Sequence, residues 1–328
     1  MGKKFQILAL SGGGYRGLFS ARILELMEEQ YGGRVADRFD LIAGTSIGGI
    51  LALGLAAGIS GADLKNIFMS HGAEIFRSRG LFSGWFGAKY DNRYLKDLLE
   101  REEYLGERLL GDSRTRLLIP AVNYTSGAPQ MFKTPHHQNF GRDHRLRMVD
   151  VAMATSAAPT YFPIYEMNSQ QYVDGGLVAN APGLLAVHEA RKFLGQDQHD
   201  IHVLAIGTVT SQDTADPTKT PDRGKARWAG SIFELTISAQ ESLSKFMLGH
   251  SLGERYLDVD VLVTEAQSAS VGLDKTDAAA TNVLLGRANH VAQQLFGRAN
   301  FRTFMSHEPD EPVFYFGPHK NVKETSDA

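Results

Sequence analysis

The stretch Phe39-Asp40-Leu41-Ile42-Ala43-Gly44-Thr45-Ser46-Ile47-Gly48-Gly49 is a short apolar run that ends in Gly-x-Ser-x-Gly, and small and apolar residues then continue to Ile59. This pattern predicts a buried strand that turns sharply into a helix, with Ser46 at the corner. Gly44 and Gly48 remove Cβ atoms that would clash at such a corner, and the helix N-terminus supplies amide donors. Because five-residue motifs recur by chance, a nucleophilic serine and an ordinary glycine turn remain equal alternatives for the pentapeptide alone.

The composition is typical of a globular protein, with 43% hydrophobic and 22% charged residues among 328. No shift in composition marks a boundary. We therefore expect a single domain over residues 1–328, with a helical and strand extension from about residue 211 and a short flexible tail at 321–328. The formal net charge of -3 predicts no nucleic-acid partner and no global attraction to an anionic membrane. The absence of cysteine excludes disulfides, thiolate metal ligands and cysteine nucleophiles.

No stretch of the sequence predicts a signal peptide or a membrane-spanning helix. The N-terminal run Phe5–Leu10 is too short for the hydrophobic core of a signal peptide. The apolar run Ile47–Ile59 is too short to cross a bilayer. We therefore expect a cytoplasmic protein whose contact with membranes is peripheral.

Strands and helices alternate in the first sixty residues, as is typical of a parallel α/β sheet. Phe5–Leu10 is expected to form the first strand, followed by the loop Ser11–Gly17 and a helix that ends near Gly32. Further strands are expected at 116–123, 130–133, 171–173, 201–206 and 255–263, and further helices at 62–76, 92–104, 149–155, 182–193, 226–248 and 277–296.

Glycine-rich corners follow three of the expected strands, at Gly12–Gly17, Gly44–Gly48 and Asp174–Gly176. In a parallel sheet the functional groups gather beyond the carboxyl ends of the strands. Ser46 and Asp174 are therefore expected to lie together, although 174 − 46 = 128 positions separate them. A serine needs a neighbouring base, and none of the eleven histidines follows a predicted strand within a glycine turn. Asp174 does, which makes it the candidate base.

The first corner admits two interpretations. Gly12, Gly14 and Gly17 match the G-x-G-x-x-G pattern of dinucleotide-binding folds, but the acidic residue expected at the end of the second strand is missing, since Asp40 lies at its start. The consecutive amides of Gly12, Gly13 and Gly14 suit a different task, which is to stabilise an oxygen that becomes negative during acyl transfer. Arg16 in the same loop either positions an anion, braces the loop or forms a structural ion pair.

Five blocks of this sequence resemble the patatin-like phospholipases, in the same order. They are Gly12–Gly17, Gly44–Gly48, Ser156–Pro163, Asp174–Gly176 and Val178–Pro182, within a similarity that covers residues 5–203. One departure is Ala181, where family members often carry a second asparagine. The resemblance implies a three-layer α/β/α fold around a central, mostly parallel sheet. It also implies a Ser–Asp dyad without metal or cofactor, in which Ser46 attacks an ester carbonyl, Asp174 is the general base, and the Gly12–Gly14 loop forms the oxyanion hole.

Within that family, the opening Phe5–Ser11, the compact length and the lack of appended domains look most like bacterial phospholipase effectors of anti-phage signalling, which a cyclic dinucleotide such as cyclic GMP-AMP activates. This resemblance implies a membrane phospholipid as substrate, a fatty acid and a lysolipid as products, and action at the inner face of the membrane. A homodimer is kept as an option. An unregulated acyl hydrolase or thioesterase, and a nucleotide-binding module that uses the glycine loop, are the alternatives.

The segment Arg77–Gly87 combines three aromatic residues with three glycines, which is unusual for a polar surface loop. It is either a loop packed on the core or a mobile apolar flap beside a lipid-binding cleft, with Arg77 and Arg79 facing headgroups. This flap and the helix expected at 226–248 are our candidates for elements that an activator repositions.

Overall fold

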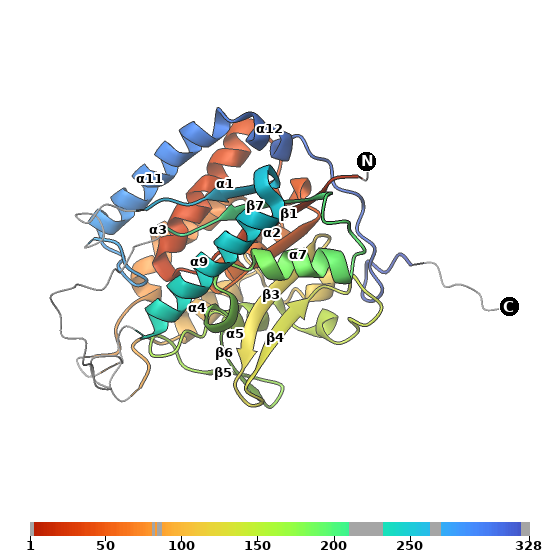
Figure 1. Cartoon of the computed structure of the whole chain (residues 1–328). Helices are drawn as coiled ribbons and strands as arrows, with labels where there is room; N and C mark the ends of the chain where they lie inside the picture. Colours follow the sequence, from red (N-terminus) through yellow and green to blue (C-terminus); the bar gives the residue numbers. More distant parts are fainter. Residues whose placement is uncertain (1–2, 81–82, 84–86, 210–231, 263–269, 323–328) are drawn as a thin grey trace.

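The computed structural model describes residues 3–80, 83, 87–209, 232–262 and 270–322. In this part of the chain one eight-stranded sheet runs through the centre, and helices cover both of its faces (Figure 1). The strands follow the order β5-β6-β3-β2-β1-β7-β8, and β4 pairs with β3 off this path. The expected central, mostly parallel sheet between helical layers is thereby confirmed.

The parallel part of the sheet contains β1 (Phe5–Leu10), β2 (Leu41–Gly44), β3 (Arg116–Asn123), β7 (Ile201–Ile206) and β8 (Tyr256–Val259). β1 lies between β2 and β7, and Leu10 pairs with Gly44 on one side and Ile206 on the other. The carboxyl ends of these three strands therefore align. Their nearly continuous apolar sequences reflect burial on both faces of the sheet.

The remaining strands, β4 (Ala128–Lys133), β5 (Tyr165–Met167) and β6 (Gln170–Asp174), are antiparallel to their neighbours. Our expectation that Asp174 ends a parallel strand is therefore wrong. β3 pairs with β2 up to Leu118 opposite Ala43 and then continues, and β6 returns along that extension with Asp174 opposite Ala121. The end of β6 thereby reaches the turn that follows β2, where Asp174 Oδ2 lies 2.6 Å from Ser46 Oγ.

The helices fall into two layers. One contains α1 (Gly17–Tyr31), α3 (Gly61–Ile75) and α11 (Ala278–Phe296), with α1 packed between the other two. On the opposite face, α7 (Gly183–Lys192) packs against α9 (Ile232–Leu252), in front of the sheet in Figure 1. The other helices of the described residues are α2 (Ile47–Ala56), α4 (Arg93–Leu99), α5 (Met148–Thr155), α6 (Gly176–Ala179) and α12 (Ala299–Met305).

The side chains of β1 alternate between two hydrophobic cores because successive Cβ atoms of a strand point to opposite faces. Leu8 and Leu10 belong to the larger core, on the side of α1, α2 and α11. Ile7 and Ala9 belong to the smaller core, with residues of α7 and α9 such as Leu248. The sheet is thus buried on both sides at the strand that leads into the glycine loop.

Most expected elements are present with bounds within a few residues, and some details differ, among them the short helix α6, which was not expected. The helix expected at 92–104 ends at Leu99, where the chain enters a series of turns. The last strand covers only 256–259, and β5 and α12 were not expected. Asp277 caps the N-terminus of α11, because its side chain accepts a hydrogen bond from Ala280 N. None of the described helices combines the length and apolarity needed to cross a bilayer.

Some expectations fall on residues outside the described part of the chain. These are the start of the extension expected from about residue 211, the first residues of the helix expected at 226–248, much of the flap at 81–86, and residues 323–328 of the tail. At the start of that tail, Asn321 donates its backbone N–H to Phe314 O (3.1 Å), so the chain is still anchored at residue 321.

Candidate active site

Ser46 occupies a sharp corner between β2 and α2. Its backbone has φ 54° and ψ −124°, an uncommon conformation for a residue with a side chain. A Cβ atom built on Gly44 would lie 2.1 Å from Gly48 O, and one built on Gly48 would lie 2.2 Å from Leu10 O. Glycine at both positions therefore lets β1, β2 and α2 approach closely enough for the chain to turn at Ser46, as the pentapeptide predicted.

The Ser46 hydroxyl donates a hydrogen bond to Asp174 Oδ2 at 2.6 Å. The other carboxylate oxygen, Oδ1, accepts the Gly176 amide at 2.6 Å. Asp174 is 2% exposed, and this burial raises the pKa of its carboxyl to about 6, although the bonds from Ser46 and Gly176 oppose the rise. At neutral pH the carboxylate is therefore ionised, and its affinity for a proton is well above that of an exposed aspartate.

Thr155, at the end of α5, joins the two sides of this pair. Its Oγ1 accepts the Ser46 amide (3.0 Å) and donates to Pro120 O on β3 (2.5 Å), and its carbonyl accepts the Gly175 amide (3.1 Å). One side chain thus holds the Ser46 corner against the strand that positions Asp174. The sequence placed Thr155 in a small-residue helix and contained no local signal for this role.

The glycine loop lies beside Ser46 and Asp174. Its backbone amides differ in whether they are free to donate a hydrogen bond. Gly12 donates its N–H to Asn180 O at 3.0 Å, which removes it from the set of free donors. Gly13 and Gly14 line the cavity next to Ser46, and no acceptor for their amides is found among the described residues. Gly17, further along the loop, packs so tightly that an added Cβ would lie 2.6 Å from Ile47 Cγ1.

Arg16 braces this loop. Its Nε donates to Gly13 O (3.4 Å) and its Nη1 to Val209 O (3.3 Å), so the side chain ties the loop to the segment that follows β7. Of the three roles considered for Arg16, these contacts favour bracing.

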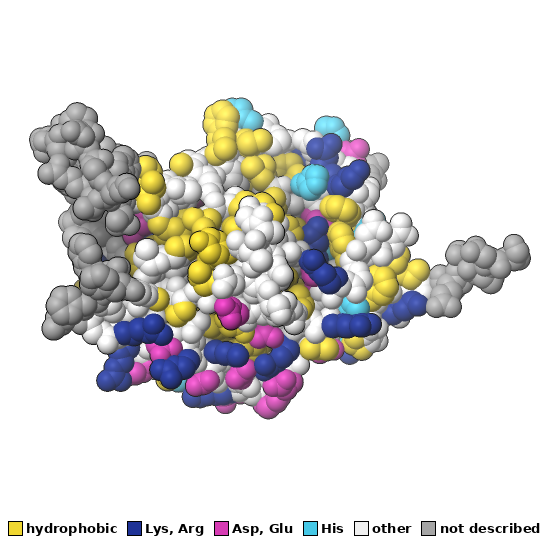
Figure 2. Space-filling model, turned by 90° about the horizontal axis from the view of Figure 1, so that it is seen from below, with side chains coloured by type: hydrophobic (Ala, Val, Ile, Leu, Met, Phe, Trp, Pro, Cys, Tyr) yellow, Lys and Arg dark blue, Asp and Glu magenta, His cyan; other side chains and the backbone are white. Residues whose placement is uncertain are grey.

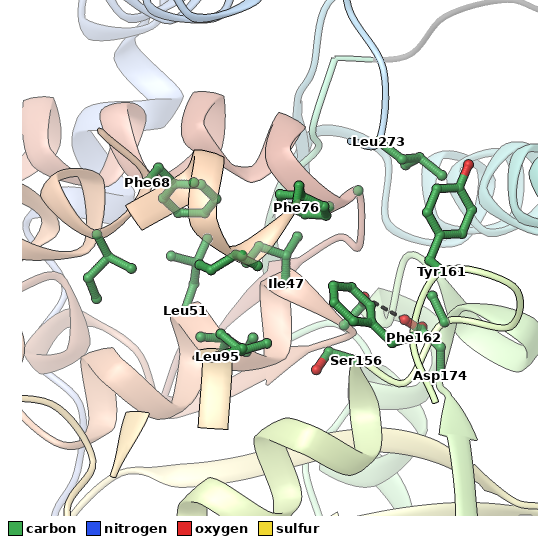
Figure 3. A pocket seen from close by; sticks show the side chains of 18 of the residues that line it. Ile47, Leu51, Phe68, Phe76, Leu95, Ser156, Tyr161, Phe162, Asp174 and Leu273 are labelled. Carbon is green, nitrogen blue, oxygen red and sulfur yellow. Dashed lines mark hydrogen bonds between the residues drawn. The ribbon is translucent and has the colours of Figure 1, made fainter. Parts of the chain in front are cut away.

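An apolar cavity of about 80 Å³ begins at the Ser46–Asp174 pair and extends between α2, α3 and α4. Figure 3 shows Leu51, Phe68 and Leu95 toward one end and Asp174, Tyr161 and Leu273 toward the other. None of the lining residues is a histidine. Asp174 is the carboxylate among the lining residues, and it is hydrogen-bonded to Ser46.

Three segments are tied together at the end of the cavity nearest the pair. Asp274 accepts hydrogen bonds from Lys89 Nζ and from the Tyr90 hydroxyl, each at 2.6 Å. Leu273 O accepts the amide of Tyr15 in the glycine loop at 2.7 Å. The C-terminal flank of the predicted flap, the loop before α11 and the glycine loop therefore form one connected rim.

The described residues contain no cluster of histidine and acidic side chains placed to hold a metal ion. In the sequence His136 has no carboxylate at a metal-ligand spacing, which predicts a loop histidine without a ligand role. Its ring is buried, with Nε2 3.0 Å from Glu189 Oε1 and Nδ1 2.8 Å from Thr134 Oγ1. This carboxylate comes from α7, 53 residues along the chain, which explains why local spacing did not reveal it.

Comparison with known proteins places this site in a family. The family model described as patatin-like phospholipase matches residues 8–187. A cGAMP-activated phospholipase of Pseudomonas aeruginosa is 47% identical over 328 residues, which cover 98% of each chain. Proteins of the same description from Vibrio cholerae and Escherichia coli are 35% and 34% identical, and cover 89% and 90% of this chain and 91% and 90% of their own.

These matches extend over nearly the whole chain, and the family match spans the glycine loop, the Ser46 corner and Asp174. They remove the alternative of a nucleotide-binding module built on the glycine loop. The chain belongs to the patatin-like phospholipase family of serine acyl hydrolases.

Proposed function

We propose that this protein releases fatty acids from membrane phospholipids with Ser46 as nucleophile and Asp174 as general base, and that cyclic GMP-AMP activates it. The observation that carries the catalytic part is the 2.6 Å hydrogen bond between Ser46 Oγ and the buried carboxylate of Asp174, at the end of an apolar cavity. The regulatory part is supported by the relatives described as cGAMP-activated phospholipases, with which the chain aligns almost from end to end.

In the first half of the reaction, Ser46 Oγ attacks the ester carbonyl carbon while its proton passes to Asp174 Oδ2. The carbonyl oxygen becomes negative, and the amides of Gly13 and Gly14 stabilise it. When this intermediate collapses, the ester bond breaks and the leaving alkoxide takes the proton from Asp174. The products of this half are a lysophospholipid and an acyl group on Ser46.

In the second half, water attacks the acyl carbonyl and transfers its proton to Asp174. The same two amides stabilise the second oxyanion. Its collapse returns the proton from Asp174 to Ser46 Oγ and releases the fatty acid. A carboxyl with a pKa of about 6 suits both steps, since it is ionised at neutral pH and yet accepts a proton more readily than an exposed aspartate.

The apolar cavity indicates which part of the substrate it binds. Walls formed by side chains such as Ile47, Leu51, Phe68 and Leu95 offer few hydrogen bonds, which suits an acyl chain and not a headgroup. At about 80 Å³ the cavity is smaller than the roughly 300 Å³ at which ligand sites usually begin. The lining must therefore part before an acyl chain enters, as expected of an enzyme that rests in a closed state.

Helix α9 is the described element best placed to contact lipid. Phe233 and Ile237 on this helix line the cavity, and Leu243 and Phe246 further along are exposed. Figure 2 shows hydrophobic side chains over the middle of one face of the molecule, with lysine, arginine and acidic side chains of both signs along its lower edge. Apolar contact, more than charge, would therefore hold the protein peripherally at the inner face of the membrane.

A lipid assay tests this proposal. Vesicles of phosphatidylethanolamine with phosphatidylglycerol are incubated with the protein, with and without cyclic GMP-AMP, and released fatty acids are measured by mass spectrometry. We expect release that requires the nucleotide and disappears in Ser46→Ala. Phe246→Ser should lower release from vesicles and spare hydrolysis of a soluble short-chain ester.

Each part of the proposal has an outcome that would contradict it. Equal release with and without the nucleotide would overturn the regulatory part and favour an unregulated acyl hydrolase. Hydrolysis of short acyl thioesters with no release from vesicles would point to a thioesterase. Normal activity of Ser46→Ala would overturn the catalytic assignment.

A further inference from the structure

Two backbone carbonyl groups of the glycine loop are held in place by hydrogen bonds. Gly12 O accepts hydrogen bonds from Asn180 Nδ2 (3.3 Å) and from Thr208 Oγ1 (2.9 Å). Gly13 O accepts the backbone N–H of Arg16 (3.2 Å) and its Nε (3.4 Å). Each carbonyl therefore has two donors that set its direction.

The direction of these carbonyls also sets the direction of two amides. In a trans peptide unit the C=O and the N–H point to opposite sides, and no described residue has a cis peptide bond. Holding Gly12 O toward Asn180 and Thr208 thus turns the Gly13 N–H the other way. Holding Gly13 O toward Arg16 does the same for Gly14. Both glycines line the cavity beside Ser46, where the substrate oxygen would become negative.

Asn180 is in turn held by helix α9. Its Nδ2 lies 3.2 Å from Glu241 Oε2, and the two residues are 2% and 7% exposed. A carboxylate can only accept hydrogen bonds, so it selects the orientation in which the NH₂ group of Asn180, and not its oxygen, faces it. The second hydrogen of that NH₂ group is then available to Gly12 O.

Glu241 is itself fixed within a buried group of charges. Lys245, one turn further along α9, lies 2.9 Å from Glu241 Oε1 and 2.6 Å from Asp260 Oδ2. Asp260 Oδ1 accepts the amide of Val209, whose carbonyl accepts from Arg16. The hydrogen bonds that hold Gly12 O and those that hold Gly13 O are therefore both linked to helix α9.

We propose that Glu241 and Asn180 are positioning residues, and that they couple the placement of helix α9 to the direction of the Gly13 amide. This inference rests on the proposed function, in which that amide stabilises the oxyanion. Because Phe233 and Ile237 of α9 also line the cavity, a shift of this helix changes the acyl-binding walls and the oxyanion donors together.

The coupling predicts a particular kinetic signature. An amide aimed at the oxyanion contributes in the transition state and little in the ground state. Loss of the hydrogen bond from Asn180 to Glu241 should therefore lower kcat and leave KM nearly unchanged. It should weaken a trifluoromethyl ketone to the same extent, because that inhibitor adds Ser46 Oγ to its carbonyl, passes the proton to Asp174 and places an oxyanion at the same point.

The experiment compares Glu241→Ala with Glu241→Gln and with Glu254→Ala, a control at an exposed acidic residue just after α9. For Glu241→Ala we expect kcat on a soluble short-chain ester to fall about 10- to 100-fold with KM within about twofold, and inhibitor affinity to fall in parallel. Glu241→Gln should recover most of the loss, since its amide oxygen still accepts from Asn180. The Glu254→Ala control should behave as wild type.

Two further measurements keep the test decisive. If Glu241→Ala does not fold, Thr208→Val removes the other donor to Gly12 O and should give the same split between kcat and KM. Hydrogen exchange of a peptide covering the glycine loop should accelerate in Glu241→Ala but not in Glu254→Ala, whether or not a lipid substrate is hydrolysed. Exchange and inhibitor affinity equal to those of the control would overturn this coupling, whereas failure of wild-type protein to act on lipid would contradict only the proposed function.

Discussion

The two halves of the proposed catalytic pair, Ser46 and Asp174, reach the same point by different routes. Ser46 lies where a parallel strand turns into a helix, and the turn depends on backbone contacts at Gly44 and Gly48. Asp174 ends an antiparallel strand that runs back along the overshooting end of β3. The general rule that functional groups gather at the carboxyl ends of parallel strands therefore explains the serine and not the aspartate.

The two halves also differ in the substitutions that they tolerate. The serine half has no room for a methyl group at its glycines, so its geometry is decided by main-chain packing. The aspartate half depends on burial and on hydrogen bonds to the carboxylate from Ser46 and Gly176, which an isosteric amide can partly replace. Substitutions at Gly44 and Gly48 in the first half should therefore disrupt the fold, whereas substitutions of Asp174 in the second should abolish the reaction.

The largest expected effect is loss of activity in Asp174→Asn. Removing the base should lower fatty-acid release by about 10³-fold or more, similar to Ser46→Ala, because the two residues act as a unit. Mass spectrometry of released fatty acids checks this result. An Asp174→Asn protein with activity near that of wild type would show that another group is the base.

The same variant should be more stable than wild type at pH 7. Burial raises the pKa of Asp174 from 3.8 to about 6, so ionisation of this residue destabilises the folded state by roughly 3 kcal/mol above pH 6. That cost shrinks as the pH falls through 6 and vanishes below 3.8, where the carboxyl is protonated in both the folded and the unfolded state. Urea unfolding at pH 7 and at pH 4 measures the difference, and equal stabilisation at both pH values would contradict this explanation.

The next effect belongs to the serine half. Gly48→Ala places a methyl group 2.2 Å from Leu10 O and forces β1 and α2 apart, which should lower the free energy of unfolding by more than about 3 kcal/mol. Gly249→Ala is the control, since an added Cβ there meets nothing within 4 Å and alanine favours the helix. A Gly48→Ala protein with a melting temperature near that of the control would show that the corner can relax.

Thr155→Val tests the side chain that joins the two halves. The change leaves the Ser46 amide and Pro120 O without their partner, which should reduce stability by about 1–3 kcal/mol and shift Ser46 relative to Asp174. We expect kcat to fall about 10-fold, since small displacements of reacting groups are costly. Thr155→Ser keeps the hydroxyl and should retain most activity. Equal loss in both variants would point to packing instead of the hydrogen bonds.

The smallest effect is the dependence of wild-type activity on pH. The base must be ionised, so kcat/KM for a soluble ester should be about half-maximal near pH 6 and fall about tenfold for each further pH unit. A profile that stays flat down to pH 5 would mean that the carboxyl in the working enzyme has a much lower pKa.

The sequence was most informative where local pattern and chemistry coincide. The apolar runs predicted the strands Phe5–Leu10, 116–123 and 201–206, and the Gly-x-Ser-x-Gly pattern predicted the corner at Ser46. The sequence also predicted a strand before Asp174. It did not predict the direction of that strand, because a short apolar run is the same pattern in a parallel and an antiparallel pair. Thr155 and Glu241 gave no signal, since a threonine in a small-residue helix and a glutamate in an amphipathic helix are ordinary.

The sequence by itself predicted the Ser46 corner, because the glycines that shape it are local. The ordered blocks that resemble the patatin-like phospholipases predicted Asp174 as the partner of that serine. The tertiary structure alone decided three things. These are the direction of the strand that brings Asp174 to Ser46, which amides of the glycine loop remain free, and the hydrogen bond between Asn180 and Glu241. These depend on how far β3 runs past β2 and on how α9 packs, which are long-range matters of register and packing. A local pattern specifies backbone conformation, whereas the partners of a buried polar group are chosen only when distant segments exclude water together.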